Sequence, residues 1–330
     1  LALSVTISLL HRSPVLCLFA TYKVTVIFQI YGALLNFSCR TCDYNFPDFL
    51  LLIHLCYIIH AMYKTFYGFK ENAFNITSDP AFYFESSQHK EAYAHLLYGI
   101  RNRKGIISMT GEVGTGKTTL CRILLNQIDE KIKTAFIFNP SFSQIQLLQM
   151  ITKDLGIPQP KKNNDKLALM SALNQFLIDE TAQGHNVAVI IDEAQNLNTV
   201  QLEQIRLLSN LETEKEKLLQ IILVGQPELL EKLKKKSLRQ LNSRISVRYH
   251  IQPLERDDVG QYITHRLNIA GAPIELNFTA SAIDDIYNFT KGTPRLINIL
   301  CEHTLLAGFV NETMTINNTL VRTAAKEALG

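Results

Sequence analysis

Residues 105–118 read Gly-Ile-Ile-Ser-Met-Thr-Gly-Glu-Val-Gly-Thr-Gly-Lys-Thr, an apolar run that leads into a glycine-rich loop. Gly111 and Gly116 let the backbone turn tightly and aim its N–H groups at phosphate oxygens, which a Cβ would obstruct. The next segment, Thr119–Ile128, has helical spacing, so a positive helix N-terminus is expected beneath the same oxygens. The order strand, loop, helix predicts a phosphate-binding loop of the Walker A type.

Each part of this loop has a predicted task. The backbone surrounds the phosphates, Lys117 reaches the β- and γ-phosphates of ATP, and Thr118 offers its hydroxyl to Mg²⁺. Lys117 is therefore a candidate catalytic residue as well as a binding residue. The candidate nucleotide-binding residues of the loop are Gly111, Glu112, Val113, Gly114, Thr115, Gly116, Lys117, Thr118 and Thr119.

A second apolar run, Val187–Ile191, ends in the acid pair Asp192-Glu193. A continuous apolar run is typical of a buried parallel strand, and its carboxyl end is expected at the same sheet edge as the loop. There Asp192 is a candidate Mg²⁺ ligand together with Thr118, and Glu193 a candidate for polarising the attacking water. The alternative is that the two acids only begin a helix, where carboxylates favour the N-terminal dipole.

Two further apolar runs also end in polar residues. Thr134–Phe138 is followed by Asn139, a candidate partner for Glu193, and Leu219–Val224 is followed by Gly225 and Gln226, a candidate sensor of the γ-phosphate. Both polar residues are also suited to ordinary turns, and Asn139 precedes a proline. The pattern thus predicts two catalytic candidates and leaves the turn interpretation open for each.

Arginine residues supply the remaining candidates. Arg239, Arg244 and Arg248 lie around the start of a strand-like segment, Val247–Ile251, and Arg244 is the preferred candidate for a finger that reaches a neighbouring subunit's nucleotide. Arg295 follows Gly292-Thr-Pro294, which fixes it in the first turn of a helix and makes it a candidate γ-phosphate sensor. Solvated surface arginines are the alternative in every case. The run Lys232–Lys236 is interpreted as a solvated helix face.

The chain divides into three predicted segments. Residues 1–61 carry few charges and no methionine, and their apolar runs are shorter than the roughly 20 residues of a membrane span. We expect them to be upstream or unstructured sequence; the pair Cys39 and Cys42 lacks the second pair of a zinc site. Residues 62–253 are the predicted nucleotide-binding domain, and residues 254–330 are the predicted helical lid.

Composition narrows the function classes only slightly. The formal charge of +3, from 33 basic and 30 acidic residues, singles out neither nucleic acid nor an anionic membrane. Cys121 and Cys301 are far apart in helical patterns, which predicts buried, reduced thiols and a cytosolic compartment.

From residue 62 onward the chain resembles the AAA+ ATPases of the general secretion pathway protein A family, which includes pilus and exopolysaccharide ATPases. The most specific matches precede the loop: Met62-Tyr-Lys-Thr-Phe-Tyr-Gly-Phe-Lys-Glu-Asn-Ala-Phe74, Ser78-Asp-Pro-Ala-Phe82, and Ser87-Gln-His-Lys-Glu-Ala92 leading to Leu97-Tyr-Gly-Ile100. Asp192-Glu-Ala-Gln195, Gly225-Gln-Pro-Glu-Leu229 and Gly292-Thr-Pro-Arg295 match downstream. Ala73 departs from a frequent proline.

The resemblance implies an α/β P-loop fold of the AAA+ type, with a three-layer parallel sheet and a small C-terminal all-helical lid. It also implies that the segment before the loop lines the adenine pocket, so Phe66, Tyr67 and Gly68 are candidates for base contact, with aromatic packing an equal alternative.

The function expected from the resemblance is ATP hydrolysis with Mg²⁺ by a homo-oligomer. Such an oligomer would help to assemble a secretion, pilus or exopolysaccharide system, and the expected location is the cytoplasm or the cytoplasmic face of the inner membrane. A DNA-transposition or replication helper ATPase is the alternative, since its motifs look much the same; a charge of +3 gives nucleic-acid binding little support. A slow nucleotide switch acting as a scaffold is a third possibility, which the intact acid pair disfavours.

Overall fold

A computed structural model describes residues 62–77, 79–138, 140, 143–159 and 165–328. The expectations for residues 1–61, including the cysteine pair Cys39 and Cys42, lie outside the described residues, as does Asn139. Within the described part, no helix combines the length and the apolar character that crossing a bilayer requires.

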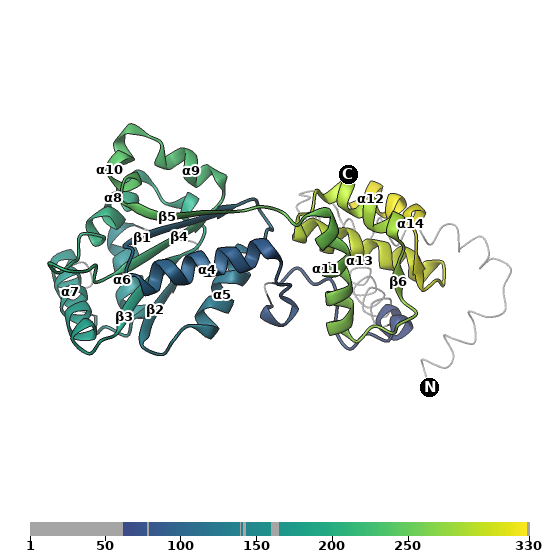
Figure 1. Ribbon diagram of the computed structural model, residues 1–330, viewed down its shortest axis with the longest axis horizontal. Helices are drawn as coiled ribbons and strands as arrows, with labels where there is room; N and C mark the ends of the chain where they lie inside the picture. The colour runs from purple at the N-terminus through teal and green to yellow at the C-terminus, as the bar shows by residue number, and fades with distance from the viewer. Residues whose placement is uncertain (1–61, 78, 139, 141–142, 160–164, 329–330) are drawn as a thin grey trace, which may run out of the picture. The chain divides into compact units, whose positions relative to one another are not determined.

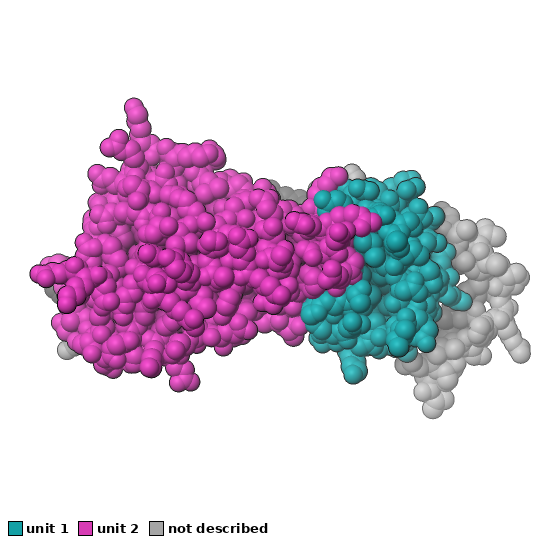
Figure 2. Space-filling model, in the orientation of Figure 1, with its two compact units in different colours: residues 1–75, 263–290, 297–330 teal, residues 76–262, 291–296 magenta. Residues whose placement is uncertain are grey.

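The chain forms two compact units (Figure 2). Unit 2 contains residues 76–262 and 291–296, and unit 1 contains residues up to 75 together with 263–290 and 297–330. These groups differ in three places from the predicted boundary at residue 254, because residues 62–75 join the C-terminal helices, and residues 254–262 and 291–296 join the nucleotide-binding unit.

Unit 2 is built on a five-stranded parallel sheet with the order β2-β3-β4-β1-β5 (Figure 1). The five strands lie where the sequence predicts strands or a strand-like segment. Apolar runs form the central strands β1, β3 and β4, which are buried on both faces and need side chains that avoid water on each side, whereas the edge strands β2 and β5 are partly exposed. The strands are β1 (Ile106–Gly111), β2 (Ile132–Ile137), β3 (Asn186–Ile191), β4 (Gln220–Gly225) and β5 (Ile245–Ile251).

Helices cover both faces of this sheet. Successive residues of a strand point to opposite faces, so Ile107 and Met109 of β1 join the apolar cluster of α4 and α5, whereas Ile106 belongs to the cluster of α6 to α10. The result is a helix–sheet–helix sandwich. The helices are α4 (Ser87–Arg101), α5 (Lys117–Gln127), α6 (Gln144–Asp154), α7 (Lys166–Ala182), α8 (Thr199–Leu208), α9 (Pro227–Leu233) and α10 (Arg239–Asn242), with 3₁₀ turns η1 (Pro80–Phe82), η2 (Ala194–Asn196) and η3 (Lys236–Leu238).

The C-terminal helices are α11 (Arg256–Ala270), α12 (Ala280–Thr290), α13 (Pro294–Val310) and α14 (Asn318–Ala328). The predicted all-helical lid needs one correction, because β6 (Asn277–Phe278) and β7 (Thr315–Ile316) pair in parallel within unit 1. Two-residue strands are too short to produce a readable alternation of apolar and polar residues.

Residues 62–75 supply core aromatics to unit 1. Tyr63 and Tyr67 are fully buried with ring centroids 5.4 Å apart, and the Tyr67 hydroxyl donates to the Leu305 carbonyl at 2.9 Å. Phe66 packs edge-on against Phe309 at 5.4 Å. These contacts support the packing interpretation of the aromatic segment. Base contact by Phe66, Tyr67 or Gly68 stays a prediction.

Candidate nucleotide site

The loop between β1 and α5 has the backbone conformation that its glycines predict. Gly114 and Gly116 have φ of +82° and +89°, a region that side chains disfavour. A Cβ on Gly111 would lie 2.7 Å from the carbonyl oxygen of Ile251, so the neighbouring strand also requires glycine there. The loop is therefore a backbone cradle of the shape that an anion needs.

The ammonium group of Lys117 is buried inside this cradle. Its Nζ donates to the carbonyl oxygens of Gly111 and Glu112, both at 2.7 Å. Burial lowers the pKa of Lys117, and the carboxylates of Glu193 and Asp192 oppose that shift. The carbonyls of Gly111 and Glu112 thus hold the Lys117 ammonium group at the start of the loop, from where it could move onto the phosphate oxygens of a nucleotide.

Thr118 and Asp192 meet at the carboxyl end of β3. The Thr118 hydroxyl donates to Asp192 Oδ2 at 2.6 Å, and Asp192 is fully buried. Burial raises the pKa of Asp192, against which the hydrogen bonds from Thr118 and from the Glu193 amide act. A hydroxyl and a carboxylate in contact with each other beside the phosphate loop provide the oxygen ligands that Mg²⁺ prefers.

Glu193 lies at the N-terminal side of η2 in a left-handed conformation, with φ +53°. This conformation is uncommon for a residue with a side chain and is concentrated at functional sites. Its carboxylate accepts hydrogen bonds from the side-chain amides of Gln195 and Gln226, the latter at 3.2 Å. The carboxylate is thus held at the sheet edge that carries Asp192.

Gln195 is a site residue that the motif analysis did not single out. Its Oε1 accepts from the backbone amide of Gln226 at 3.1 Å, so one side chain links the ends of β3 and β4. The only sequence signal was its place in the Asp192-Glu-Ala-Gln195 match. The prediction for Gln226 as a sensor is untested, although its amide contacts the predicted water-polarising group.

Lys232 requires a correction to the predicted solvated face. Its Nζ donates to the carbonyl oxygens of Gln195 and Leu197, the second at 3.0 Å, whereas Lys234, Lys235 and Lys236 are exposed as predicted. A lysine in α9 therefore caps free carbonyls at the end of η2. The sequence pattern alone did not distinguish it from its neighbours.

Arg295 lies beside the phosphate loop. Its backbone amide donates to the Gly114 carbonyl at 3.3 Å, and a Cβ on Gly114 would meet the Arg295 Cβ at 2.4 Å. The exposed side chain starts next to the cradle, in the first turn of α13. This placement is compatible with the sensor role, which remains a prediction.

Arg244 lies at the opposite edge of the sheet. It precedes Ile245, which pairs with Ile106 at the start of β1, whereas the loop follows the end of β1. Six residues of strand separate the two levels, roughly 20 Å at 3.3 Å per residue. Arg244 therefore does not reach the loop of its own chain.

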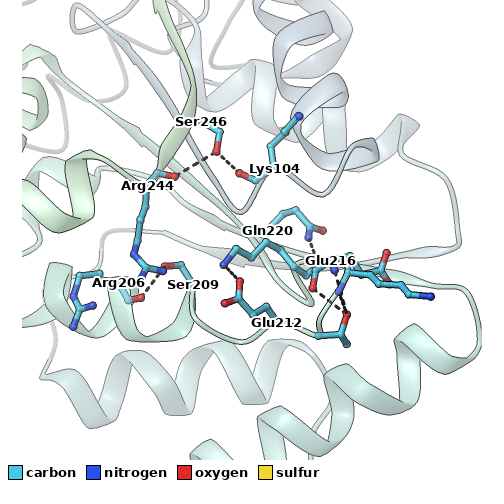
Figure 3. Close-up of polar contacts among 11 residues, drawn as sticks. Lys104, Arg206, Ser209, Glu212, Glu216, Gln220, Arg244 and Ser246 are labelled. Atoms are coloured by element: carbon cyan, nitrogen blue, oxygen red, sulfur yellow. Dashed lines mark hydrogen bonds and ion pairs between the residues drawn. The ribbon is translucent and has the colours of Figure 1, made fainter.

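Figure 3 shows Arg244 directed toward Ser209, whose hydroxyl lies 3.5 Å from Nη1 and donates to the Arg206 carbonyl. Of the two alternative arginines, Arg248 donates to the carbonyl and side-chain oxygens of Asn242, and Arg239 is exposed at the start of α10. Arg244 itself is partly buried.

A family model described as an AAA domain matches residues 100–233, which contain the loop, the acid pair and Gln226. Residues 100–233 are an AAA domain. This chain is 41% identical over 269 residues to general secretion pathway protein A of Aeromonas hydrophila, which confirms the predicted resemblance. The match covers 82% of this chain and 49% of that protein, so the chain spans about half the length of this curated relative.

Solved structures agree with the AAA assignment of the fold. The Aeropyrum pernix ORC2 protein in its ADP form aligns with a TM-score of 0.57 at 16% identity, over 78% of this chain and 73% of that chain. Cdc6p from Pyrobaculum aerophilum aligns with a TM-score of 0.58 at 17% identity, over 75% and 70%. At such identities the likeness shows the fold alone, and it confirms the predicted α/β P-loop class.

Proposed function

We propose that this AAA-domain protein binds ATP with Mg²⁺ in the loop Gly111–Thr118 and hydrolyses it. One observation carries the proposal: Lys117, Thr118, Asp192 and Glu193 converge at the carboxyl edge of one parallel sheet. They arrive as two pairs, one at the start of α5 and one after β3, that are about 75 residues apart in the chain, so the cluster is hard to explain as a local turn.

The proposed division of labour follows from the contacts. The loop amides and Lys117 bind the phosphates, Thr118 and Asp192 hold Mg²⁺, and Glu193 orients the attacking water with Gln226 beside it. Mg²⁺ would supply charge neutralisation on the β- and γ-phosphates. Arg295 is the proposed sensor of the γ-phosphate, and Asn139 remains a proposed partner of Glu193.

We further propose a homo-oligomer in which Arg244 of one subunit completes the site of the next. Its distance from its own loop and its loose attachment to Ser209 support this assignment. The proposed role is assembly of a secretion, pilus or exopolysaccharide system at the cytoplasmic face of the inner membrane, supported by the named relative. The DNA-helper alternative has no observation in its favour beyond a shared fold.

Two substitutions test the enzymatic core of this proposal. Lys117→Ala removes the cation of the cradle and is expected to abolish ATP binding, measured by titration calorimetry, whereas Lys153→Ala on the exposed side of α6 should bind normally. Glu193→Gln should bind ATP but turn it over at least about a hundredfold more slowly, measured by phosphate release. Wild-type affinity in Lys117→Ala, or wild-type turnover in Glu193→Gln, would remove that residue from the site.

A further inference from the structure

His89 lies in the first turn of α4, behind the phosphate loop. It is 5% exposed, and its two ring nitrogens face different elements. Nε2 lies 3.0 Å from the carbonyl oxygen of Thr115, and Nδ1 lies 2.7 Å from the hydroxyl of Ser86, the N-cap of α4. One buried side chain thus connects the start of a helix to the backbone of the loop.

The chemistry of these two partners fixes the proton on the ring. A carbonyl oxygen only accepts, so Nε2 must carry the proton that is donated to Thr115. Nδ1 of the neutral ring then accepts from the Ser86 hydroxyl. Burial lowers the pKa of His89, which favours this neutral form, although the Thr115 hydrogen bond and the carboxylates of Asp258 and Glu85 act in the other direction.

The direction of the Thr115 carbonyl determines the direction of the next amide. In a planar trans peptide unit the C=O and the following N–H point to opposite sides. Because the Thr115 oxygen is held against His89, the N–H of Gly116 must point away from His89. Lys117 Nζ bonds the carbonyls of Gly111 and Glu112, the first residues of the cradle. The geometry therefore aims the Gly116 N–H toward the inside of the loop.

The same ring explains why residue 116 has no side chain. A Cβ on Gly116 would lie 2.9 Å from His89 Nε2, and its φ of +89° already disfavours one. His89 thus occupies the space directly behind the amide that a phosphate would contact. The Thr115 carbonyl oxygen and the space beside the Gly116 Cα thus both face the His89 ring.

We propose that His89 is a positioning residue that presets the Thr115–Gly116 peptide of the loop to bind phosphate. This role rests on the proposed nucleotide site and deepens it. His89 itself does not touch the ligand; it fixes, through one hydrogen bond, the orientation of a backbone donor. Presetting a donor reduces the ordering that binding requires and so raises affinity.

The test compares His89→Leu, which has no donor, with His89→Gln, whose side-chain amide can reach the Thr115 oxygen. His95→Leu is the matched control, because His95 lies on the same helix with a side chain that is 41% exposed. ADP without Mg²⁺ is the first probe, since it depends on the loop rather than on the metal. ATP hydrolysis then separates KM from kcat.

His89→Leu is expected to weaken ADP binding about tenfold, the scale of one hydrogen bond, and to raise KM with kcat changed less than about threefold. His89→Gln should recover affinity to within about threefold of wild type, and His95→Leu should match wild type. Equal losses in the leucine and glutamine variants, or unchanged affinity in His89→Leu, would overturn the proposal.

Nitrogen NMR of the wild-type chain gives an answer even if His89→Leu does not fold. The His89 resonance, assigned by its loss in His89→Gln, should show a neutral ring with the proton on Nε2, and a proton on Nδ1 alone would contradict the proposal. If the wild-type chain binds neither ADP nor ATP, the nucleotide site itself fails, whereas the proposal for His89 fails when wild type binds and the variants behave alike.

Discussion

At the level of single residues, the contact between Gln226 and Glu193 is the most informative feature of the site. A carboxylate that orients water must be held in place, because a small displacement of a catalytic group lowers the rate strongly. Gln226 donates to the Glu193 carboxylate at 3.2 Å, and Gln195 donates to the same oxygen. The side-chain amides of Gln195 and Gln226 therefore both hold the Glu193 carboxylate in place.

We predict that Gln226→Ala lowers ATP turnover by about tenfold to a hundredfold while ATP affinity stays within about threefold of wild type. The loss should be smaller than that of Glu193→Gln, because Gln195 still contacts the carboxylate. Steady-state phosphate release and ATP titration measure the two quantities. Gln240→Ala on the exposed side of α10 is the control; if affinity falls as much as turnover, Gln226 binds the nucleotide rather than positioning Glu193.

At the level of elements, Lys232 attaches α9 to η2. The ammonium group of Lys232, on α9, donates hydrogen bonds to the carbonyl oxygens of Gln195 and Leu197. These carbonyls lie at the end of the short 3₁₀ turn η2, where backbone carbonyls lack a partner within the turn. A charged hydrogen bond of this kind contributes about 1.5–3 kcal/mol. The turn that follows Glu193 is therefore stabilised from α9, the helix after β4.

We predict that Lys232→Met, which keeps the stem and removes the donor, increases amide hydrogen exchange in residues 194–197 by about tenfold or more. Lys234→Met is the matched control. Lys234 pairs with Glu231 on the surface, and such pairs contribute less than about 1 kcal/mol, so exchange in residues 194–197 should not change. Equal exchange rates in the two variants would show that Lys232 does not hold the turn.

At the level of the whole molecule, the position of Arg244 bears on assembly. Arg244 lies at the amino-terminal edge of the sheet, and the loop lies at the carboxyl-terminal edge. A cation at that position can serve a nucleotide only in another subunit. The proposed oligomer therefore depends on Arg244, which cannot reach the nucleotide loop of its own chain.

We predict that Arg244→Ala leaves ATP binding nearly intact and lowers turnover by about a thousandfold, at the low end for arginine fingers. Turnover per wild-type subunit should rise with protein concentration. Mixing Arg244→Ala with Glu193→Gln subunits should restore part of the activity, because each variant retains the group that the other lacks. A mixture that co-assembles and stays inactive would show that Arg244 does not complete the site of a neighbouring subunit.

The sequence by itself determined the sheet and the edge at which the candidate site lies. Apolar runs predicted the three strands that are buried on both faces, β1, β3 and β4, and a shorter apolar run and a strand-like segment indicated the two edge strands. Parallel strands place their carboxyl ends together. Asp192, Glu193 and Gln226 could therefore be assigned to one edge before any coordinates were known, since each directly follows a strand or its last glycine. Local order along the chain carries this information.

Tertiary structure decided the contacts that have no local signature. Three hydrogen bonds to backbone carbonyls join residues that are far apart in the chain: His89 to Thr115, Lys232 to Gln195, and Tyr67 to Leu305. A histidine, a lysine or a tyrosine has the same side chain whether it faces solvent or a backbone carbonyl. Only the three-dimensional arrangement of the elements fixes which carbonyl each one meets, because hydrogen bonds depend on distance and direction in space.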